Sequence, residues 1–285
     1  MTSVAEAIRQ AAADLAATSD TARLDSEVLM ASALGTSRSD LLIRKMSDTA
    51  PGEFAAMVER RKASEPVAYI IGEQEFFGRS FTVNSDVLIP RSDSETLIEA
   101  ALSETRDKSS GRVLDLGTGS GALLLTFLSE KDGWDGCGID NSAGALAVAK
   151  ANSARLHLED RAGLFLRDWR QRGSAGGAGA AWTDGLGSFD LVIANPPYVE
   201  SAARLDRDVR EFEPHSALFA GPDGLDDYKV IVPQLREILS GRGIALFEIG
   251  ATQAEALGKI AENNGFSAEL RRDLANRPRC VVLRQ

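Results

Sequence analysis

The chain has few of the residues that build disulfide frameworks and metal centres. Its 285 residues include two cysteines and two histidines, and Cys137 and Cys280 lie far apart in the sequence. Two distant cysteines do not form the disulfide framework of a small secreted protein, and no Cys/His cluster has the spacing of a zinc site. We therefore expect a cytoplasmic protein without a metal centre.

Long apolar runs and excess positive charge are also missing. No stretch approaches the run of about 20 apolar residues that spans a bilayer, and the first residues lack the basic and apolar order of a secretory signal. The formal net charge is −10, whereas proteins that grip long nucleic acid by its phosphates usually have a basic surface. We expect no membrane association, no direct nucleic-acid binding, and a monomer that takes a small-molecule cofactor and a protein partner.

What the chain does contain is enough apolar sequence for two domains, with 44% hydrophobic and 26% charged residues, as in ordinary globular proteins. Over residues 1–74, apolar side chains recur at helical spacing, beginning with Val4–Leu15, which predicts a small helical domain without catalytic chemistry. Residues 75–90 are interpreted as a β-hairpin linker with a tight turn at Gly78-Arg79. The second domain is expected over residues 91–285.

In the second domain, strands alternate with helices from Arg112 onward, the pattern of a doubly wound α/β sheet of Rossmann-like type. Short apolar runs predict strands over 113–116, 137–140, 164–166, 189–194 and 244–248, with a closing pair over 267–271 and 280–283. Helices are predicted over 142–155, 227–239 and 253–263.

Two further segments of this domain carry local predictions. Ser92 and Glu95 have the spacing of a capping box, which predicts that they open a helix. Arg91, just before them, is not explained by a cap. The Gly/Ala-rich stretch Gly173–Gly187 is interpreted as a mobile loop without chemistry.

A glycine-rich loop follows the first strand of the sheet, in the segment Asp115–Gly121. Its glycines alternate, whereas a dinucleotide fingerprint places its third glycine one residue later, over a pyrophosphate. The alternating pattern is that of S-adenosylmethionine (AdoMet) sites. Asp140 ends the next strand about 20 residues on, where an acidic side chain can hold two ribose hydroxyls, although a solvated strand-end aspartate is the plain alternative.

Asp168 and Trp169 follow the third strand at the same edge of the sheet. They could flank an adenine ring, and Trp169 could equally belong to the core. The predicted cofactor-binding residues are therefore Gly117, Thr118, Gly119, Ser120, Gly121, Asp140, Asp168, Trp169 and Asn195.

The segment Leu191–Tyr198 begins as a strand buried on both faces and ends in Asn195-Pro196-Pro197-Tyr198. Neither proline has an N–H group, so the backbone there is stiff and presents carbonyl oxygens. Asn195 adds a side-chain carbonyl and NH₂ group. Such a site suits a planar NH₂ group of an acceptor, unless the prolines only stiffen a turn. Since ligands of open α/β sheets bind beyond the carboxyl ends of the strands, this segment and the cofactor residues are expected at one rim.

These motifs resemble those of the HemK/PrmC family of release-factor glutamine methyltransferases over essentially the whole chain. The matching segments are the helical N-terminal part, the hairpin, Pro90–Glu95, the glycine loop, Asp140–Leu146, Asn195–Tyr198, Glu213–Leu218 with Gly224-Leu225, and Glu248–Gly250. The Gly/Ala-rich loop before Phe189 is longer than the family usually has.

The resemblance implies a class I AdoMet-dependent methyltransferase fold with a seven-stranded sheet and an N-terminal domain that docks the substrate. The implied reaction is methyl transfer to the side-chain amide nitrogen of the glutamine in the Gly-Gly-Gln motif of class 1 peptide chain release factors. Asn195 and Pro196 would hold the acceptor NH₂ group, and Tyr198 would pack against it, with Pro197 also at the substrate site. Three alternatives remain open: a ribosomal-protein glutamine as acceptor, adenine-N6 methylation of nucleic acid, and a binding module with an inactive AdoMet fold.

Overall fold

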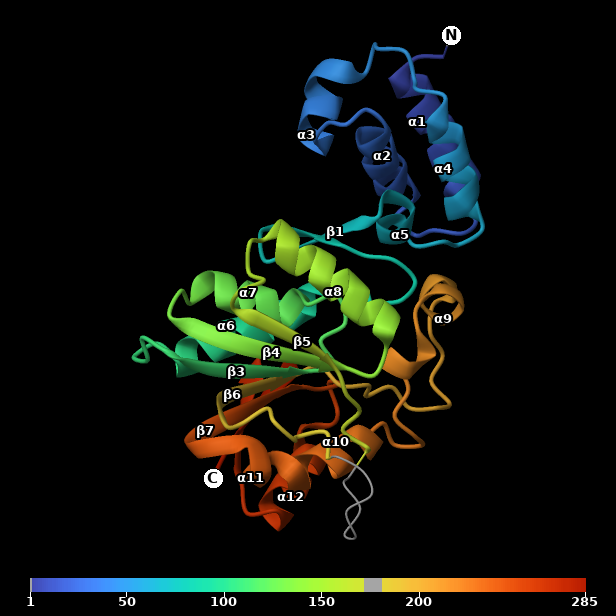
Figure 1. The fold of residues 1–285 in the computed structure, drawn as a ribbon. Helices are drawn as coiled ribbons and strands as arrows, with labels where there is room; N and C mark the ends of the chain where they lie inside the picture. The colour runs from blue at the N-terminus through green and yellow to red at the C-terminus, as the bar shows by residue number, and fades with distance from the viewer. Residues whose placement is uncertain (1, 172–180) are drawn as a thin grey trace. The chain divides into compact units, whose positions relative to one another are not determined.

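The computed structural model describes residues 2–171 and 181–285. The chain forms two compact units, one of Met1–Glu73 with Leu205–Glu213 and the other of Gln74–Arg204 with Pro214–Gln285 (Figure 1). The nine residues Leu205–Glu213 therefore pack with the N-terminal helices although the flanking chain belongs to the second unit. Nothing in the sequence pattern of this segment predicted that association.

The first unit is helical, as its apolar spacing predicted. Its helices are α1 (Val4–Leu15), α2 (Ala22–Ala33), α3 (Arg38–Asp40), α4 (Glu53–Lys62), α5 (Val67–Ile71) and α9 (Arg207–Phe212), with a π-helical turn at Leu41–Lys45. Helix α1 buries Val4, Ile8, Ala11 and Leu15 on one face, because residues three and four apart share a helix side. These side chains form one core cluster with α2 and α4.

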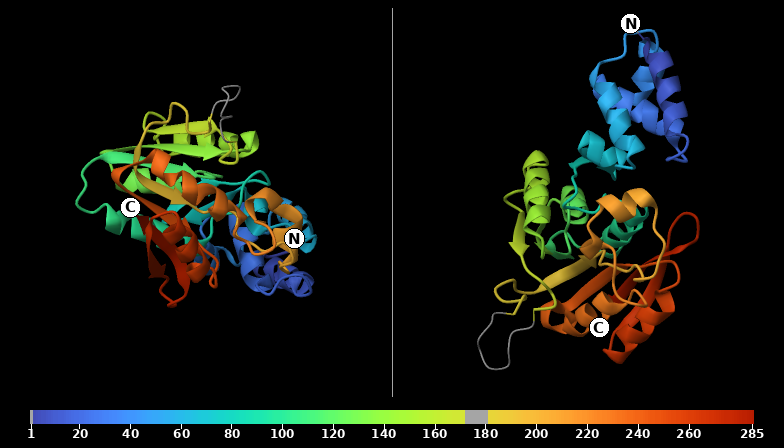
Figure 2. Two further views of the ribbon diagram at one scale, coloured as in Figure 1. Left: turned by 90° about the horizontal axis from the view of Figure 1, so that it is seen from below. Right: turned by 90° about the vertical axis from the view of Figure 1, so that its right-hand side faces the viewer.

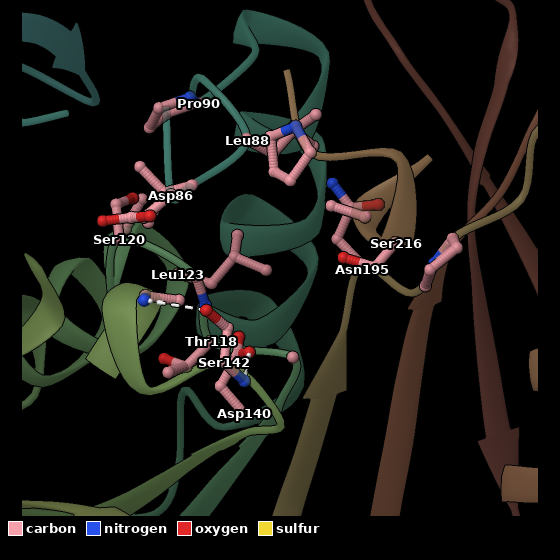
Figure 3. Close-up of a pocket in the computed structure, with 18 of the residues that line it drawn as sticks. Asp86, Leu88, Pro90, Thr118, Ser120, Leu123, Asp140, Ser142, Asn195 and Ser216 are labelled. Atoms are coloured by element: carbon pink, nitrogen blue, oxygen red, sulfur yellow. Dashed lines mark hydrogen bonds between the residues drawn. The ribbon is translucent and has the colours of Figure 1, made fainter. Parts of the chain in front are cut away.

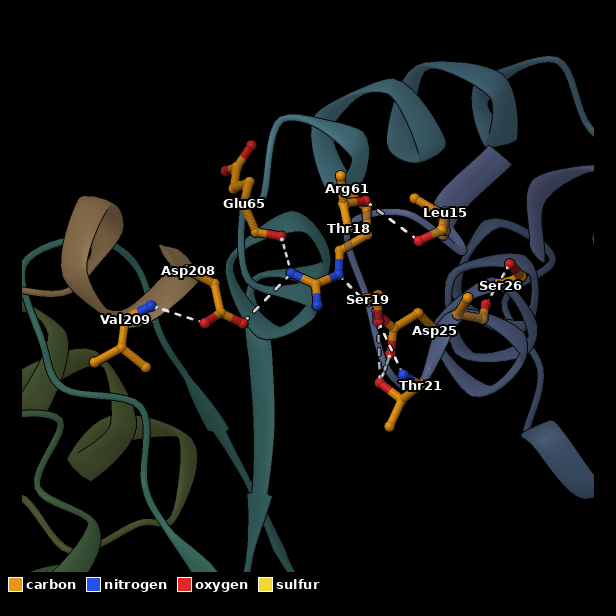
Figure 4. Close-up of polar contacts among 11 residues, drawn as sticks. Leu15, Thr18, Ser19, Thr21, Asp25, Ser26, Arg61, Glu65, Asp208 and Val209 are labelled. Atoms are coloured by element: carbon orange, nitrogen blue, oxygen red, sulfur yellow. Dashed lines mark hydrogen bonds and ion pairs between the residues drawn. The ribbon is translucent and has the colours of Figure 1, made fainter. Parts of the chain in front are cut away.

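A buried ion pair ties α9 into this unit (Figure 4). The Arg61 guanidinium lies 2.7 Å from Asp25 and 3.5 Å from Asp208 of α9, and it also donates to the backbone carbonyl of Glu65. Arg61 and Asp25 are almost wholly buried. A buried charge needs partners of this kind because an unpaired one loses its hydration without compensation.

A hairpin opens the second unit, with β1 (Glu73–Phe76) and β2 (Arg79–Thr82). Its turn was predicted at Gly78-Arg79 and lies one residue earlier, at Phe77-Gly78. Both central residues have positive φ, +52° and +74°, as the favoured two-residue hairpin turn requires. The Glu95 carboxylate accepts the Phe77 N–H at 3.0 Å, so a contact from a distant helix holds the phenylalanine in a conformation that the sequence pattern assigned to glycine.

The main sheet has seven strands in the order β5-β4-β3-β6-β7-β9-β8, which confirms the predicted α/β class. The first five strands in chain order are parallel, β8 runs in the same direction, and β9 lies between β7 and β8 and is antiparallel to both. Their bounds are β3 (Gly111–Leu116), β4 (Trp134–Asp140), β5 (Ala162–Leu166), β6 (Phe189–Ala194), β7 (Leu239–Glu248), β8 (Ser267–Arg272) and β9 (Pro278–Arg284).

Helices cover both faces of this sheet (Figures 1 and 2). One face carries α6 (Glu95–Glu104), α7 (Ala122–Glu130) and α8 (Ala143–Arg155); the other carries α10 (Asp226–Ile231), α11 (Leu235–Ile238) and α12 (Ala254–Asn263). Alternate residues of a strand serve the two cores: Leu191 and Ile193 pack on the α6–α7 side, and Val192 and Ala194 on the α10–α12 side. Burial on both faces is why these strands are continuous apolar runs.

Three local features complete the comparison with the sequence. The capping box at Ser92 and Glu95 was wrong: Ser92–Ser94 form a short 3₁₀ turn, and α6 begins at Glu95 without a side-chain cap. The Glu95 carboxylate bonds the hairpin instead. The part of the Gly173–Gly187 loop up to residue 180 lies outside the described residues; in the described end, Trp182 and Leu186 are buried in the core, so the mobile-loop interpretation was wrong there. Within the described chain, none of the helices is long and apolar enough to cross a membrane.

Candidate active site

Strands β3 and β6 lie side by side at the centre of the sheet and are parallel, with Leu116 opposite Ala194. The strand order reverses direction between them, since β4 and β5 continue on one side and β7 on the other. Ligands of doubly wound sheets bind at such a switch point. The pairing brings the glycine loop and Asn195, one residue after each strand, to the same place.

The glycine loop folds back on β4. Gly117, Gly119 and Gly121 all have positive φ, a conformation that other L-residues rarely adopt. The N–H groups of Gly117 and Thr118 both donate to the Ile139 carbonyl at 2.9 Å. Gly117 and Gly119 line the pocket, and because glycine has no side chain, a ligand can approach their backbone closely.

Asp115, at the start of the loop, was not singled out from the sequence. Its buried carboxylate accepts the Thr118 hydroxyl at 2.7 Å, and burial raises its pKa to about 7. The carboxyl is fully buried and lies outside the pocket lining, so it supports the loop and does not face a ligand.

Asp140 lies in the pocket lining, at the end of β4. One carboxylate oxygen accepts the Gly119 N–H and the other accepts the Ser142 N–H, each at 2.9 Å. Burial raises the pKa of this carboxyl. Each oxygen has a second lone pair, so the side chain can accept from two ligand hydroxyls while it remains tied to the loop.

Trp169 is both a core residue and part of the pocket wall, so the two roles considered from the sequence do not exclude each other. It belongs to the core cluster on the α10–α12 side and lines the pocket. A Cβ atom on Gly117 would lie 3.2 Å from its ring. Its indole N–H donates to Asp227 at 2.8 Å, which in turn pairs with Arg170 at 2.6 Å.

Asp168 is oriented differently from its neighbour. Its carboxylate accepts the Arg170 N–H at 2.8 Å, and it is not among the pocket-lining residues, whereas Arg170 is. The structure therefore brings Trp169 to the pocket and keeps the Asp168 carboxylate on the following turn.

Asn195 lines the pocket on the side opposite Asp140 (Figure 3). Its Nδ2 atom donates to the Ser94 hydroxyl at 3.2 Å, which leaves the side-chain oxygen as a free acceptor. Pro197 also lines the pocket, while Gly121, Pro196 and Tyr198 do not. Gly121 instead is the N-cap residue that precedes α7. Ser94 was known from the sequence only as part of Pro90–Glu95, since nothing local indicates that it reaches Asn195.

Tyr198 points to a buried carboxyl behind the pocket. Its hydroxyl donates to Glu248 at 3.2 Å, and burial raises the pKa of the phenol. Glu248 ends β7, is 2% exposed, and has its pKa raised by burial to about 7. The Glu248 backbone carbonyl accepts the Tyr228 hydroxyl at 2.7 Å.

Most of the remaining lining comes from two segments whose residues the sequence analysis did not predict as site residues. One is the run before α6 and the other follows α9. The two segments overlap the motifs of the resemblance, Pro90–Glu95 and Glu213–Leu218, although residues 85–89 come before the first motif. Besides Ser94, these lining residues are Ser85, Asp86, Val87, Leu88, Ile89, Pro90 and Arg91, and Pro214, Ser216 and Ala217. Across the described part of the chain, no group of three or more His, Cys, Asp or Glu side chains is placed to hold a metal ion.

The buried Glu248 carboxyl gives a stability prediction. Its folded pKa of about 7 exceeds the ordinary value of 4.5, so between these pH values the unfolded chain releases a proton that the folded chain keeps. Wild-type stability relative to Glu248→Gln should therefore fall as the pH rises from 4 to 8, by about 3 kcal/mol, and stay constant above. Urea unfolding of both proteins at each pH measures this; a difference independent of pH would contradict it.

Two family models match the chain in consecutive parts. The model described as PrmC N-terminal domain matches residues 6–72, and the model described as methyltransferase small domain matches residues 93–217. The first covers the helical region and the second covers the glycine loop, Asp140 and Asn195.

Relatives of similar length match nearly the whole chain. A protein of Cereibacter sphaeroides is 39% identical over 98% of this chain and 98% of its own, and one of Rhodospirillum rubrum is 37% identical over 92% and 79%. A protein of Coxiella burnetii is 33% identical over the full length of both. All three are named release factor glutamine methyltransferase.

Solved structures with little sequence identity share the fold. The hMettl16 catalytic domain in complex with MAT2A 3'UTR hairpin 6 matches with a TM-score of 0.55 and 15% identity over 82% of both chains. A methyltransferase from Pyrococcus furiosus matches with a TM-score of 0.50 and 12% identity, over 81% of this chain and 96% of its own. At such identities the likeness shows the architecture alone.

Proposed function

Because the chain belongs to the release factor glutamine methyltransferase family, we propose that it methylates the side-chain amide nitrogen (N5) of the glutamine in the Gly-Gly-Gln motif of class 1 peptide chain release factors. The observation that carries this proposal is the placement of Asn195 opposite the glycine loop and Asp140 in one pocket. Its fold is that of class I AdoMet-dependent methyltransferases.

The cofactor side of the pocket fits AdoMet, which supplies an electrophilic methyl group on a sulfonium. A Cβ atom on Gly119 would meet no protein atom closer than 4.0 Å, so the space in front of the loop is open to a ligand. We assign the methionyl moiety to Gly117–Gly121, the ribose hydroxyls to Asp140, and the adenine to the Trp169 wall. Asp168 supports this wall from the adjoining turn.

On the acceptor side, the free Asn195 oxygen and the Pro196 carbonyl accept the two N–H groups of the glutamine amide. This arrangement aims the nitrogen at the methyl group. Pro197 closes the wall beside the amide. The Tyr198 ring, predicted to pack against the amide plane, lies behind this wall with its hydroxyl on Glu248, so we assign it a supporting role. An amide nitrogen is a weak nucleophile because its lone pair is delocalised, so alignment, worth about 7–11 kcal/mol in favourable cases, is the main contribution of these residues. The N-methylated, protonated amide is strongly acidic and loses its proton to solvent.

The helical unit has no cofactor chemistry, and we assign to it the docking of the protein substrate. We propose that the enzyme acts as a monomer in the cytoplasm, where release factors work, and that it binds neither nucleic acid nor membrane. The net charge of −10 favours a protein acceptor over a polyanion.

The test is mass spectrometry of acceptors incubated with enzyme and AdoMet. Full-length release factor should gain one methyl group on the glutamine of Gly-Gly-Gln, and a release factor with that glutamine replaced by alanine should gain none. Ribosomal proteins and duplex or single-stranded DNA serve as the alternative acceptors. Labelling of any of these in preference to the release factor would overturn the proposal.

A further inference from the structure

Gln253 bonds the backbone near the acceptor site through both its side-chain oxygen and its side-chain nitrogen. Its oxygen accepts the Gly250 N–H at 3.0 Å. Its nitrogen donates to the carbonyls of Tyr198 at 3.0 Å and Gly224 at 3.1 Å. The side chain is 8% exposed. An amide has one acceptor and one NH₂ donor pair, so this set of partners permits only one orientation of the group.

Three chain segments converge on this amide: the end of Asn195–Tyr198, the turn after β7, and the turn before α10. There is no room between them. A Cβ atom on Gly224 would lie 2.2 Å from the Tyr198 carbonyl oxygen and 2.7 Å from the Gln253 nitrogen, and Gly224 has a φ of +66°. The Gln253 side chain therefore joins these three turns by hydrogen bonds to the backbone of each.

The consequence for Asn195 follows from the stiffness of the intervening chain. Before Asn195, the backbone is held by the pairing of Ala194 with Leu116. After it, the two prolines restrict φ and have no N–H groups. The next backbone group along the chain that Gln253 holds is the Tyr198 carbonyl. A segment held at both ends with a stiff middle has little freedom to move the Asn195 backbone or to turn the Pro196 carbonyl, and the Ser94 hydroxyl holds the Asn195 side chain.

We propose that Gln253 is a positioning residue for the acceptor amide: by holding the Tyr198 carbonyl it keeps Asn195 and Pro196 aligned for methyl transfer. The proposal rests on the function proposed above and adds a residue that acts on it without touching the substrate. It predicts a defect in turnover and not in cofactor affinity.

Gln234 provides a matched control. It is 5% exposed, its oxygen accepts the Trp182 indole N–H at 2.8 Å, and its nitrogen donates to the carbonyls of Trp169 at 3.2 Å and Val230 at 2.7 Å. As in Gln253, the side-chain oxygen accepts one hydrogen bond and the nitrogen donates two, but the segment that Gln234 holds contains Trp169 of the pocket wall. The two glutamines thus have similar structural roles on the two different sides of the pocket.

The experiment compares Gln253→Glu and Gln234→Glu in the full chain. A carboxylate cannot donate, so each variant faces two carbonyls without a bond. For Gln253→Glu, kcat with the release factor should fall about tenfold or more, while the AdoMet Kd measured by calorimetry stays within about twofold. Gln234→Glu should instead raise the AdoMet Kd about fivefold or more.

The stoichiometry of AdoMet binding in calorimetry gives the concentration of folded enzyme, and kcat is calculated from that concentration. If the glutamate variant does not fold, Gln253→Met, which is neutral and of similar length, takes its place with the same expected result. Wild-type kcat in a folded Gln253 variant, or the same pattern of kcat and Kd in the Gln253 and Gln234 variants, would overturn the inference alone. A wild-type enzyme that does not methylate the release factor would overturn the proposed function first.

Discussion

Replacing Asn195 by alanine is expected to lower kcat for release-factor methylation by about 100-fold, equivalent to about 2.7 kcal/mol of lost transition-state stabilisation. The variant should fold, because Asn195 lies at a strand end in the pocket and not in either core of the sheet. The KM for the release factor should change much less, since the lost contact matters most when nitrogen and methyl group align.

Single-turnover methylation at saturating AdoMet measures this effect. Asn195→Asp refines it: a carboxylate still accepts from the acceptor NH₂ and can accept from the Ser94 hydroxyl, but it brings a charge and loses the donor that Asn195 gives to Ser94. We expect this variant to be weak yet faster than alanine. Asn264→Ala, whose side chain bonds Ile260 at the end of α12, is the control. A wild-type rate for Asn195→Ala would show that the Asn195 side chain has no role in the reaction and that the residue only forms part of a turn.

Replacing Gly119 by valine is expected to weaken AdoMet binding by about 100-fold or more. The φ of Gly119 is +54°, which a β-branched residue adopts only at a cost of about 1–2 kcal/mol. The larger effect comes from the side chain itself, since the space at its Cβ is empty of protein atoms and is assigned to the ligand. The measurement is the AdoMet Kd by calorimetry.

Gly35→Val separates the two causes. Gly35 has a closely similar φ of +59°, and a Cβ atom there would also meet no protein atom within 4 Å, but the residue lies in the helical unit. This variant should show the backbone strain as reduced thermal stability and keep wild-type AdoMet affinity. Equal Kd values for wild type and Gly119→Val would place the cofactor elsewhere.

The strands of the sheet were predictable because their burial is two-sided. Strand β6 was predicted over its observed range, Phe189–Ala194, since a strand covered by helices on both faces is a continuous apolar run. Strand β7 begins at Leu239 and not at Ile244. The added residues include Gly241 and Arg242, which carry no apolar signal, so only the pairing of Leu239 with Phe189 reveals them.

The hairpin and α6 show where local pattern was not enough. Glu95 has capping-box spacing, yet its carboxylate bonds the Phe77 N–H, and the same contact accompanies the shift of the turn by one residue. A spacing rule considers partners three residues away, whereas this partner is 18 residues away in the chain.

The sequence by itself determined the α/β class, the helical N-terminal region, and the positions of the glycine loop, Asp140 and Asn195, because each is encoded by neighbours in the chain: periodic burial, glycine spacing and strand ends. Only the tertiary structure decided what holds these residues. The partner of Asn195 is Ser94, 101 positions away; that of Trp169 is Asp227, 58 away; and that of the Tyr198 carbonyl is Gln253, 55 away. A hydrogen bond between distant residues imposes no period and no spacing on either segment, so it becomes visible only when the strands have brought both ends to the same rim.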